Sequence, residues 1–306
     1  MQFKQVAIID YVNITKEAFE KVSSLSESET IIYDSDPRGQ EEVKERISDA
    51  DCILVGWRTK ITEEVLDSCK NLKFICLSGT NSDNIDLEAC RKRGIVVSNI
   101  IAYGDEGVGE WIFSQLLILA RGLGKYKWGK GHVELSGKTL GIIGLGAIGK
   151  LLADIALGFH MNVLYNSKTR KPEWEKKGLL FVEKEELLKR SDIISLQTPK
   201  NVKIISKEDF KIMKGKILVN NTLGRAFNEG DFKEWIQKEG NFAIVDKSGI
   251  ADFKGALDNI NKVMYSDFIA GTTQESTVRL GQKIEENMKA YLLGEQIGRA
   301  SCRERV

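Results

Sequence analysis

Three glycines in the segment TLGIIGLGAIGKLLADIALGF have the spacing of a phosphate-binding turn. Gly144, Gly146 and Gly149 form a G-x-G-x-x-G pattern that follows an apolar run and opens an apolar, helix-like stretch. In such a turn the first glycine permits a tight bend, the second lets a pyrophosphate approach the backbone, and the third lets the helix lie close to the strand. The free amides of Ala147 and Ile148 then face phosphate oxygens at the positive end of the helix. The pattern predicts a dinucleotide site, and a glycine-rich turn that only permits close packing is the alternative.

The next apolar run, MNVLYN, bears on which dinucleotide is bound. A site that prefers NAD would end this strand with an acid that accepts a hydrogen bond from the ribose 2′-hydroxyl. The segment from Met161 to Lys171 contains no acid. Ser167, Lys168 and Arg170 instead provide a hydroxyl and two cations suited to a 2′-phosphate. We therefore expect NADP(H) to be favoured over NAD(H), while solvated loop cations with no ligand are the alternative.

Short apolar runs that alternate with helix-like segments must position these residues. The first series contains VAIID, TIIYD, CILVG, KFICLSG and GIVVSN, and the second contains TLGIIG, MNVLYN, DIISLQ, KILVNN, FAIVD and KVMYS. Such alternation is typical of parallel sheets with crossover helices, and the second series suits a complete dinucleotide-binding sheet. A long apolar helix over 106–121 and a Gly- and Lys-rich surface connector separate the two series. A final helix over 275–293 is expected to pack one face, which carries Val278, Ile284, Met288 and Leu292.

The whole-chain composition limits the classes of function. At 306 residues, with 42% hydrophobic and 29% charged residues, the chain suits about two soluble globular domains. Lys and Arg total 45 against 44 Asp and Glu, so we expect neither nucleic acid nor a membrane as a partner. The five cysteines form no C-x-x-C pair and have no metal-ligand spacing with His132 or His160, so we expect reduced thiols and no metal site. The N-terminal segment lacks the pattern of a signal peptide, which favours the cytoplasm.

Unlike the rest of the chain, the C-terminal segment is expected to be non-native. The segment IGRASCRERV matches the translation of a common sequencing adapter, residue for residue. We therefore expect residues 296–306, which include Cys302, to be a non-native tail that carries no function.

Taken together, the motifs resemble those of the D-isomer-specific 2-hydroxyacid dehydrogenase family, which includes glyoxylate and hydroxypyruvate reductases. The resemblance rests on SGTNSDNIDLEACRKRGIVVSN, SGKTLGIIGLGAIG, SDIISLQTP, ILVNNTLGR and FIAGTTQES, which together span nearly the whole chain. It implies an α/β fold with two Rossmann-like domains and parallel sheets, one flavodoxin-like and one NAD(P)-binding. Residues 1–101 and 271–295 would form the substrate domain, and residues 102–270 the NAD(P)-binding domain. The resemblance also implies a homodimer formed largely through the NAD(P)-binding domain.

The family assignment implies an oxidoreductase that transfers hydride between a nicotinamide and a 2-keto or 2-hydroxy acid. The substrate carboxylate would bind backbone amides in the loop at Ser78, Gly79 and Thr80, a turn that, taken alone, is equally an ordinary strand end. On the cofactor side, the family's pattern adds four positions to the glycine loop: Thr198, Pro199, Thr222 and Asp246.

The positions at which the family carries catalytic side chains are altered in this chain. Reduction of a ketone places negative charge on its oxygen, so the reaction needs a proton donor and a cation near that atom. The family normally supplies an arginine, a glutamate and a histidine. The corresponding positions here are Leu223, Gly249 and Phe268, which lack such groups. A further position that is often histidine is Gln197.

Other side chains near these positions could replace the missing groups. Arg225, Lys247, Ser248 and Asp267 are the candidates, and each is also explained as a structural or solvated residue. The two histidines lie in the connector and at the end of the helix after the glycine loop, where we expect surface or helix-end roles. Two hypotheses follow: an oxidoreductase with a replaced proton donor, and a catalytically impaired NADP(H)-binding sensor or regulatory protein.

Overall fold

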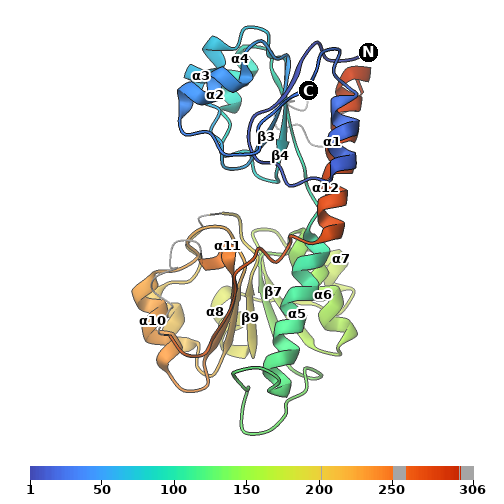
Figure 1. The fold of residues 1–306 in the computed structure, drawn as a ribbon. Helices are drawn as coiled ribbons and strands as arrows, with labels where there is room; N and C mark the ends of the chain where they lie inside the picture. The colour runs from blue at the N-terminus through green and yellow to red at the C-terminus, as the bar shows by residue number, and fades with distance from the viewer. Residues whose placement is uncertain (201, 251–259, 296, 298–306) are drawn as a thin grey trace. The chain divides into compact units, whose positions relative to one another are not determined.

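The chain forms two compact units. The first contains residues 1–103 and the segment that begins at Gln274, and the second contains residues 104–273. Each unit is built on a parallel sheet with helices on both faces (Figure 1). The roles of substrate domain and NAD(P)-binding domain for these units remain predictions. The computed structural model describes residues 1–200, 202–250, 260–295 and 297.

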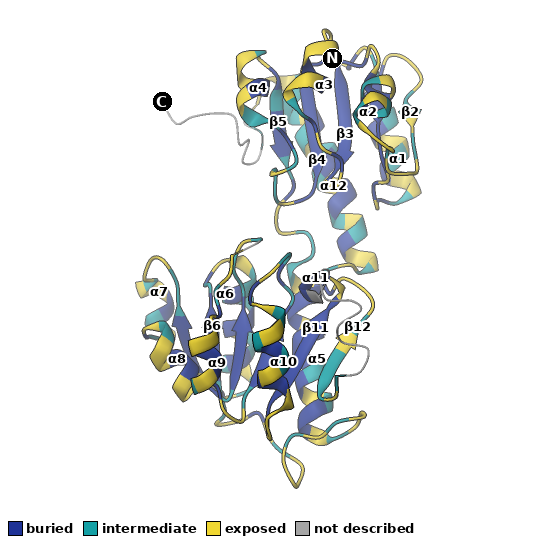
Figure 2. Cartoon of the chain, turned by 90° about the vertical axis from the view of Figure 1, so that its left-hand side faces the viewer, coloured by how far each residue is buried: buried dark blue, intermediate teal, exposed yellow. Residues whose placement is uncertain are grey.

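The sheet of the first unit has the strand order β2-β1-β3-β4-β5, and all neighbouring strands are parallel. Its central strands are buried along their whole length because helices cover both faces (Figure 2). The strands are β1 (Val6–Ile8), β2 (Ile31–Ile32), β3 (Cys52–Gly56), β4 (Phe74–Ser78) and β5 (Val96–Asn99). The helices are α1 (Lys16–Ser23), α2 (Gln40–Ile47), α3 (Glu63–Ser68), α4 (Leu87–Lys92) and α12 (Gln274–Leu293).

Two clusters of apolar side chains hold these helices on the sheet. Helices α2, α3 and α4 pack on one face through residues such as Val43 and Leu66. Helices α1 and α12 pack on the other face and against each other. Gly281 of α12 lies against Ala18 of α1, where any side chain on the glycine would overlap the alanine methyl. Helix α12, near the end of the chain, is therefore part of the same hydrophobic core as α1, near its beginning.

The packed face of α12 differs from the sequence-based prediction at one position. Ile284 and Met288 are fully buried and Leu292 is half-buried, as expected, whereas Val278 is 43% exposed. Leu280 takes its place in the core because it lies one helical turn before Ile284, on the same face. The prediction for Val278 was wrong because a spacing of six residues places it off that face.

The second unit contains the sheet β12-β11-β10-β9-β6-β7-β8, which is also parallel throughout. The chain proceeds from β6 outwards to β8, then returns to β9 and continues to β12, so its direction reverses between β6 and β9. Open α/β sheets bind ligands at such a point, outside the carboxyl ends of the strands. The strands are β6 (Thr139–Ile143), β7 (Asn162–Asn166), β8 (Leu180–Phe181), β9 (Ile193–Leu196), β10 (Ile217–Asn220), β11 (Phe242–Asp246) and β12 (Val263–Ser266). The helices are α5 (Asp105–Arg121), α6 (Ala147–Gly158), α7 (Pro172–Glu175), α8 (Lys184–Arg190), α9 (Lys207–Ile212), α10 (Glu229–Gln237) and α11 (Lys247–Ile250).

Helices α5 and α6 cover one face of this sheet, and α8, α9 and α10 cover the other (Figure 2). Helix α5 is buried around most of its circumference, as its apolar sequence predicts. Gly109 lets α6 approach closely, because a side chain there would press on Leu151 and Ile155. The connector after α5 is less exposed than expected, since Leu135 is buried and Trp128 packs against the same core.

The cysteines in the described part of the first unit are buried. Cys52, Cys69, Cys76 and Cys90 form no disulfide within the described residues, and burial raises the pKa of Cys76 to about 12. Cys302 and all but one residue of the tail expected over 296–306 lie outside the described residues.

Membrane-spanning helices and metal-binding clusters are both absent from the described ranges. None of the helices there has both the length and the apolar character needed to cross a membrane. Within the same residues, His, Cys, Asp and Glu side chains form no group of three or more that could hold a metal ion.

Candidate functional site

The glycine loop joins β6 to α6 and leaves open space at its centre. Gly144 has a φ of +101°, and a side chain there would overlap the Gln197 carbonyl. A side chain on Gly149 would overlap the Gly144 carbonyl in the same way, so its absence lets α6 lie against β6. Gly146 differs, because nothing lies within 4 Å of the position that its Cβ would take. The loop therefore has, beside Gly146, the room that a pyrophosphate requires.

The start of α6 also lacks a side-chain cap. Gly146 is the N-cap residue and offers no side-chain acceptor to the first amides of the helix, which include those of Ala147 and Ile148. Amides at a helix start need an acceptor, and the positive end of the helix dipole favours an anion. This arrangement suits the phosphate contact predicted for these residues.

A buried hydroxyl without a partner lies just beyond the neighbouring strand. The Oγ1 atom of Thr198, after the end of β9, is buried and makes no hydrogen bond within the described part of the chain. Such an atom is rare in a folded protein and suits a polar group of a ligand. Gln197 donates hydrogen bonds of 2.9 Å to both Ser195 Oγ and Asn221 Oδ1, and so joins the ends of β9 and β10. Pro199 follows as an exposed residue.

The loop after β7 is held by an ion pair. Arg170 donates two hydrogen bonds to the Glu175 carboxylate, one of them 3.1 Å long from Nε. The Tyr165 hydroxyl donates a further bond of 2.7 Å to the same carboxylate. The Arg170 guanidinium and the Tyr165 hydroxyl hold the pKa of Glu175 below its usual range. The guanidinium is therefore fixed in direction although it lies on the surface.

The three contacts predicted for a 2′-phosphate differ in their surroundings. Lys168 is exposed, Arg170 has a carboxylate partner, and the Ser167 hydroxyl donates to a backbone carbonyl within the loop at 2.6 Å. Sequence reasoning missed Glu175 because the search for an acid ended at Lys171, whereas α7 turns the chain back against the loop. An acid therefore does lie beside this loop, but its charge is balanced by Arg170.

The turn after β11 is fixed by the buried Asp246. Its side chain is 1% exposed, and its two oxygens accept hydrogen bonds from the amides of Gly249, at 2.8 Å, and Ala270, at 2.9 Å. Burial raises the pKa of this carboxyl, although these hydrogen bonds act in the opposite direction. Asp246 thus joins the start of α11 to the segment after β12. This role is structural, and the cofactor contact expected for Asp246 remains a prediction.

The backbone of α11 also contacts the end of β10. Asn220 is fully buried, and its Nδ2 atom donates to the Gly249 carbonyl at 3.0 Å. Its Oδ1 atom accepts a bond of 2.7 Å from the Thr222 hydroxyl, so that Thr222 is 8% exposed and directed at Asn220. A side chain on Gly249 would overlap the Asn220 carbonyl oxygen. No larger residue therefore fits at position 249 in this backbone.

Two of the candidate replacement side chains form an ion pair beside this turn. The Nζ atom of Lys247 lies 3.6 Å from Oδ1 of Asp267, and both side chains are largely exposed. The Tyr265 hydroxyl donates to the same Asp267 oxygen at 2.9 Å. Phe268, the next residue, is 52% exposed, and its carbonyl accepts a bond of 3.1 Å from the Lys247 amide. The structure therefore brings Lys247 and Asp267 together. Ser248, the residue after Lys247, is buried, at 6% exposure.

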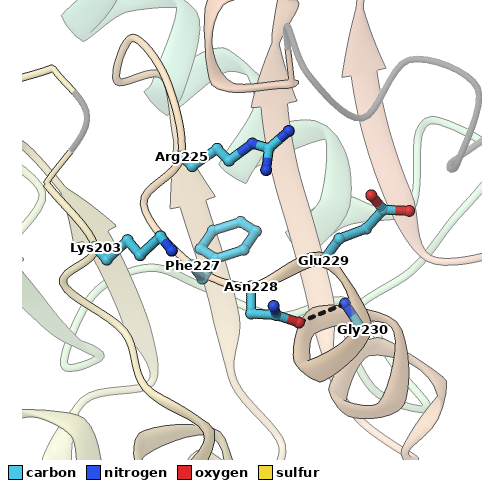
Figure 3. Close-up of a pocket in the computed structure, with 6 residues that line it drawn as sticks. All are labelled: Lys203, Arg225, Phe227, Asn228, Glu229 and Gly230. Carbon is cyan, nitrogen blue, oxygen red and sulfur yellow. Dashed lines mark hydrogen bonds between the residues drawn. The ribbon is translucent and has the colours of Figure 1, made fainter.

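A third candidate, Arg225, lines a pocket at the start of α10 instead. Asn228 caps this helix by accepting a hydrogen bond of 2.9 Å from the Gly230 amide (Figure 3). Lys203 lies on a different segment from Arg225 and Phe227, and all three line this pocket (Figure 3). The pocket has a volume of about 290 Å³ and is lined by Lys203, Arg225, Phe227, Asn228, Glu229 and Gly230. Residues of the glycine loop are not among them.

The loop predicted to hold a substrate carboxylate, in the first unit, uses one of its amides internally. Ser78 ends β4 and is buried, and the next amide, that of Gly79, donates to the Leu77 carbonyl at 2.9 Å. The Thr80 hydroxyl donates to the Ile100 carbonyl at 3.1 Å. The Gly79 amide therefore has an internal acceptor in this structure, because the chain bends back in a three-residue turn at that point, and the carboxylate contact of this loop remains a prediction.

Side chains beside this loop were not found from the sequence. Trp57, after β3, lies against Gly79, where an added Cβ would be 3.2 Å from the Trp57 Cβ. Arg58 lies over the Trp57 ring at 5.2 Å and pairs with Asp36 at 2.8 Å. The buried Asp10 accepts hydrogen bonds from the turn after β3, and burial raises its pKa. These residues come from separate segments that only the sheet brings together, so no spacing pattern marks them.

The two histidines do not lie at the carboxyl ends of the strands. His132 is in the connector, with Nδ1 2.8 Å from the Arg121 carbonyl. His160 follows the end of α6 in the left-handed region, with a φ of +56°. Both positions agree with the surface and helix-end roles expected for them.

Comparison with known proteins identifies the family to which this chain belongs. The family model for the catalytic domain of D-isomer specific 2-hydroxyacid dehydrogenases matches residues 6–301. The chain belongs to this family. A glyoxylate reductase from Thermococcus litoralis is 31% identical over 290 residues, which cover 85% of each chain.

Solved structures of similar proteins contain both nicotinamide cofactors. An acyclic imino acid reductase in complex with NADPH and D-Arg is 25% identical, with a TM-score of 0.81 over 96% of this chain and 98% of its own. A D-lactate dehydrogenase from Aquifex aeolicus in complex with NAD and lactic acid is 26% identical, with a TM-score of 0.78 over 98% of this chain and 100% of its own. The comparisons therefore support a nicotinamide cofactor without selecting between the two.

Membership among the 2-hydroxyacid dehydrogenases confirms the family and the fold class predicted from the sequence. The α/β fold with two Rossmann-like units is as expected, and the protein is an oxidoreductase of the 2-hydroxyacid dehydrogenase type. The alternative of an impaired sensor or regulatory protein has no support in these comparisons.

The residues of this dehydrogenase fit a bound dinucleotide. The open space at Gly146, the uncapped start of α6 and the unpartnered Thr198 hydroxyl lie at the carboxyl ends of β6 and β9. These are the two strands between which the strand order reverses. The chemistry of the three features suits phosphate and hydroxyl groups.

The altered catalytic positions of this dehydrogenase differ in whether the backbone leaves room for a side chain. Leu223 is half-buried and Phe268 is exposed, so both positions hold a side chain of another type. Gly249 has no room for a side chain in this backbone, and its correspondence with the family's glutamate position remains a prediction. The next acid along the chain, Asp252, lies outside the described residues.

Proposed function

We propose that this dehydrogenase interconverts a 2-keto acid and the corresponding 2-hydroxy acid, with NADP(H) favoured over NAD(H). The observation that carries the proposal is the open space beside Gly146 at the uncapped start of α6, together with the Thr198 hydroxyl, which has no partner among the described residues. A bound nicotinamide would supply or accept the hydride. The amides at the start of α6 would hold the phosphates, and the hydroxyl of Thr198 would bind a polar group of the same ligand.

The preference for NADP(H) rests on the loop after β7. Lys168 and Arg170 place two cations in this loop, and β7 ends in a neutral asparagine. Glu175 offsets part of the charge, but it also fixes the direction of the Arg170 guanidinium. A guanidinium that is already oriented loses less conformational freedom when it binds a phosphate. Because the pair lies on the surface and is screened by salt, we expect a selectivity of about tenfold.

A small 2-keto acid is the proposed substrate class. Relatives are named as a glyoxylate reductase and as a D-lactate dehydrogenase complexed with lactic acid. The loop at Ser78, Gly79 and Thr80 remains the proposed contact for the substrate carboxylate. Trp57 and Arg58 lie beside this loop and are proposed to face the rest of the substrate.

The proposed assembly and location follow from the same family assignment. We propose a cytoplasmic homodimer formed through the second unit, with no nucleic acid or membrane as partner. Size-exclusion chromatography with light scattering tests the dimer, and a monomer at micromolar concentration would exclude it.

Two measurements on purified protein test the proposed function. Fluorescence titration gives the dissociation constants of NADPH and NADH, and we expect NADPH to bind about tenfold more tightly. Absorbance at the nicotinamide band follows NADPH oxidation with glyoxylate, hydroxypyruvate and pyruvate, of which at least one should turn over. Tighter binding of NADH would overturn the cofactor preference, and the absence of turnover on all three acids would overturn the substrate class.

A further inference from the structure

Three ionisable side chains meet at the carboxyl ends of β11 and β12. The strand register pairs Asp246 with Ser266, so the residues that follow them, Lys247 and Asp267, lie side by side. The Lys247 Nζ atom is 3.6 Å from Asp267 Oδ1, and the Tyr265 hydroxyl donates to that oxygen at 2.9 Å. Strand pairing therefore brings Lys247 to Asp267, whereas Tyr265 lies two residues from Asp267 in the sequence.

This cluster lies at the same edge of the sheet as the glycine loop. All strands of the second unit are parallel, so the carboxyl ends of β6, β9, β10, β11 and β12 share one edge. The Lys247 amide donates to the Phe268 carbonyl at 3.1 Å, which holds the exits of β11 and β12 together. The Lys247 and Asp267 side chains are 54% and 67% exposed, so the pair faces solvent at this edge.

The proposed reaction requires a proton donor at this edge. When the carbonyl carbon of a 2-keto acid accepts a hydride, its oxygen becomes an alkoxide that must take up a proton. A lysine ammonium can release a proton, whereas an arginine guanidinium stays protonated in proteins. Arg225 is therefore unsuited to this step, and it lines the pocket at the start of α10.

The neighbours of Lys247 are less suited than Lys247 to donate a proton to the substrate oxygen. The Tyr265 hydroxyl already donates to Asp267, and burial and that carboxylate raise the pKa of Tyr265. Asp246 is buried, and both its oxygens accept bonds from backbone amides. Ser248 is buried and has no acidic proton to give at neutral pH. Lys247 is an exposed member of this group, and its side chain is of a type that can release a proton.

We propose that Lys247 is the proton donor to the carbonyl oxygen and that Asp267 is a positioning residue that holds its ammonium; this assignment rests on the function proposed above. In the reduction, the hydride adds to the carbonyl carbon and the π electrons move to the oxygen. One N–H bond of the Lys247 ammonium breaks as the O–H bond of the hydroxy acid forms. The neutral amine regains a proton from water, and in the oxidation it accepts the hydroxyl proton.

The test compares wild-type protein with the variants K247M, K247R, K247A and D267N. The matched control is K233M, because Lys233 is a partly exposed lysine of the same unit that pairs with Glu229 at 2.6 Å. We expect kcat with glyoxylate and NADPH to fall about 100-fold or more in K247M and K247R, since a general acid contributes about 10²–10⁴-fold. We expect D267N to lose about tenfold and K233M to match the wild type. Added methylamine should restore activity to K247A and not to D267N.

Two readouts do not depend on turnover. Oxamate, a non-reducible analogue with a carbonyl oxygen, should bind the K247M–NADPH complex about tenfold more weakly than the wild-type complex, whereas the dissociation constant of NADPH itself should stay within about twofold. The melting temperature should change little, and K247R provides the conservative variant if K247M is unstable.

The outcomes separate the two proposals. If K247M and K247R keep kcat within about threefold of wild type, Lys247 is not the donor and the proposed function stands. A normal rate in K247R with a slow K247M would also overturn proton donation, because positive charge alone would then suffice. Wild-type protein without turnover on any of the three 2-keto acids would overturn both the function and the donor.

Discussion

Gly249 lies so close to Asn220 that no side chain fits between the start of α11 and the end of β10. The Asn220 Nδ2 atom donates to the Gly249 carbonyl at 3.0 Å, and a methyl group at position 249 would overlap the Asn220 carbonyl oxygen. We therefore expect G249A to lower the free energy of unfolding by about 1–3 kcal/mol, as measured by urea denaturation.

The control for G249A is G158A, at the end of α6. Nothing lies within 4 Å of a methyl group added at Gly158, and alanine favours a helix more than glycine does. We expect this variant to be as stable as the wild type or more so. Equal changes in the two variants would show that crowding against Asn220 is not the cause.

The open space beside Gly146 predicts an effect on binding without an effect on folding. In G146A a methyl group would enter the space proposed for the pyrophosphate while contacting no protein atom within 4 Å. We expect the dissociation constant of NADPH, measured by fluorescence titration, to rise about tenfold or more, with an unchanged urea midpoint. G158A on the same helix should bind NADPH normally. Unchanged affinity in G146A would place the dinucleotide elsewhere.

Features that depend on neighbouring residues could be predicted from the sequence, whereas contacts that depend on the path of the backbone could not. The G-x-G-x-x-G spacing and the alternation of apolar runs are local signals, and they gave the parallel sheets and the turn at Gly146. Glu175 is only five residues from Arg170, yet α7 must turn the chain before they meet. Such a contact depends on geometry that no spacing rule contains.

The composition of the site was harder to predict than the fold. Lys247 and Asp267 are twenty positions apart in the sequence. They pair because the register of β11 against β12 places them side by side. The Gly79 amide is expected to contact a substrate carboxylate, and a local turn directs it to the Leu77 carbonyl in this structure. In both cases the residue types were visible in the sequence, whereas their partners were decided by the backbone.

Removal of Arg170 is expected to shift the cofactor preference. The variant R170M lacks the guanidinium that Glu175 orients in the loop after β7. We expect the ratio of NADPH to NADH affinity to fall about tenfold, with NADH affinity within about twofold of wild type. K189M is the control, since Lys189 is an exposed lysine paired with Glu185 on α8. An equal loss for both cofactors would assign Arg170 a structural role only.

The lowered pKa of Glu42 in the first unit leads us to expect that its contribution to folding stability is lost at acid pH. The Arg38 amide and the buried Arg46 guanidinium lower its pKa from 4.5 to about 2. A carboxylate whose pKa is lower in the folded state stabilises the fold above its unfolded pKa, and this contribution is lost as the pH falls towards the folded value. We therefore expect E42Q to be less stable than wild type at neutral pH, with a difference that shrinks below about pH 5.

Urea unfolding at a series of pH values measures this difference. E41Q is the control, because the Glu41 side chain is 80% exposed and should contribute little at any pH. A difference between E42Q and wild type that stays constant from pH 7 to the acid limit of folding would contradict a charge-dependent contribution from Glu42.

Transfer of hydride from NADPH to a 2-keto acid is the central claim, and isotope labelling measures it directly. Wild-type protein is incubated with glyoxylate and NADPH deuterated at both C4 positions of the nicotinamide, and the product is analysed by mass spectrometry. We expect glycolate that carries one deuterium on carbon 2, in an amount equal to the NADPH consumed. Product without deuterium would contradict this claim, as would NADPH that is not consumed with glyoxylate, hydroxypyruvate or pyruvate.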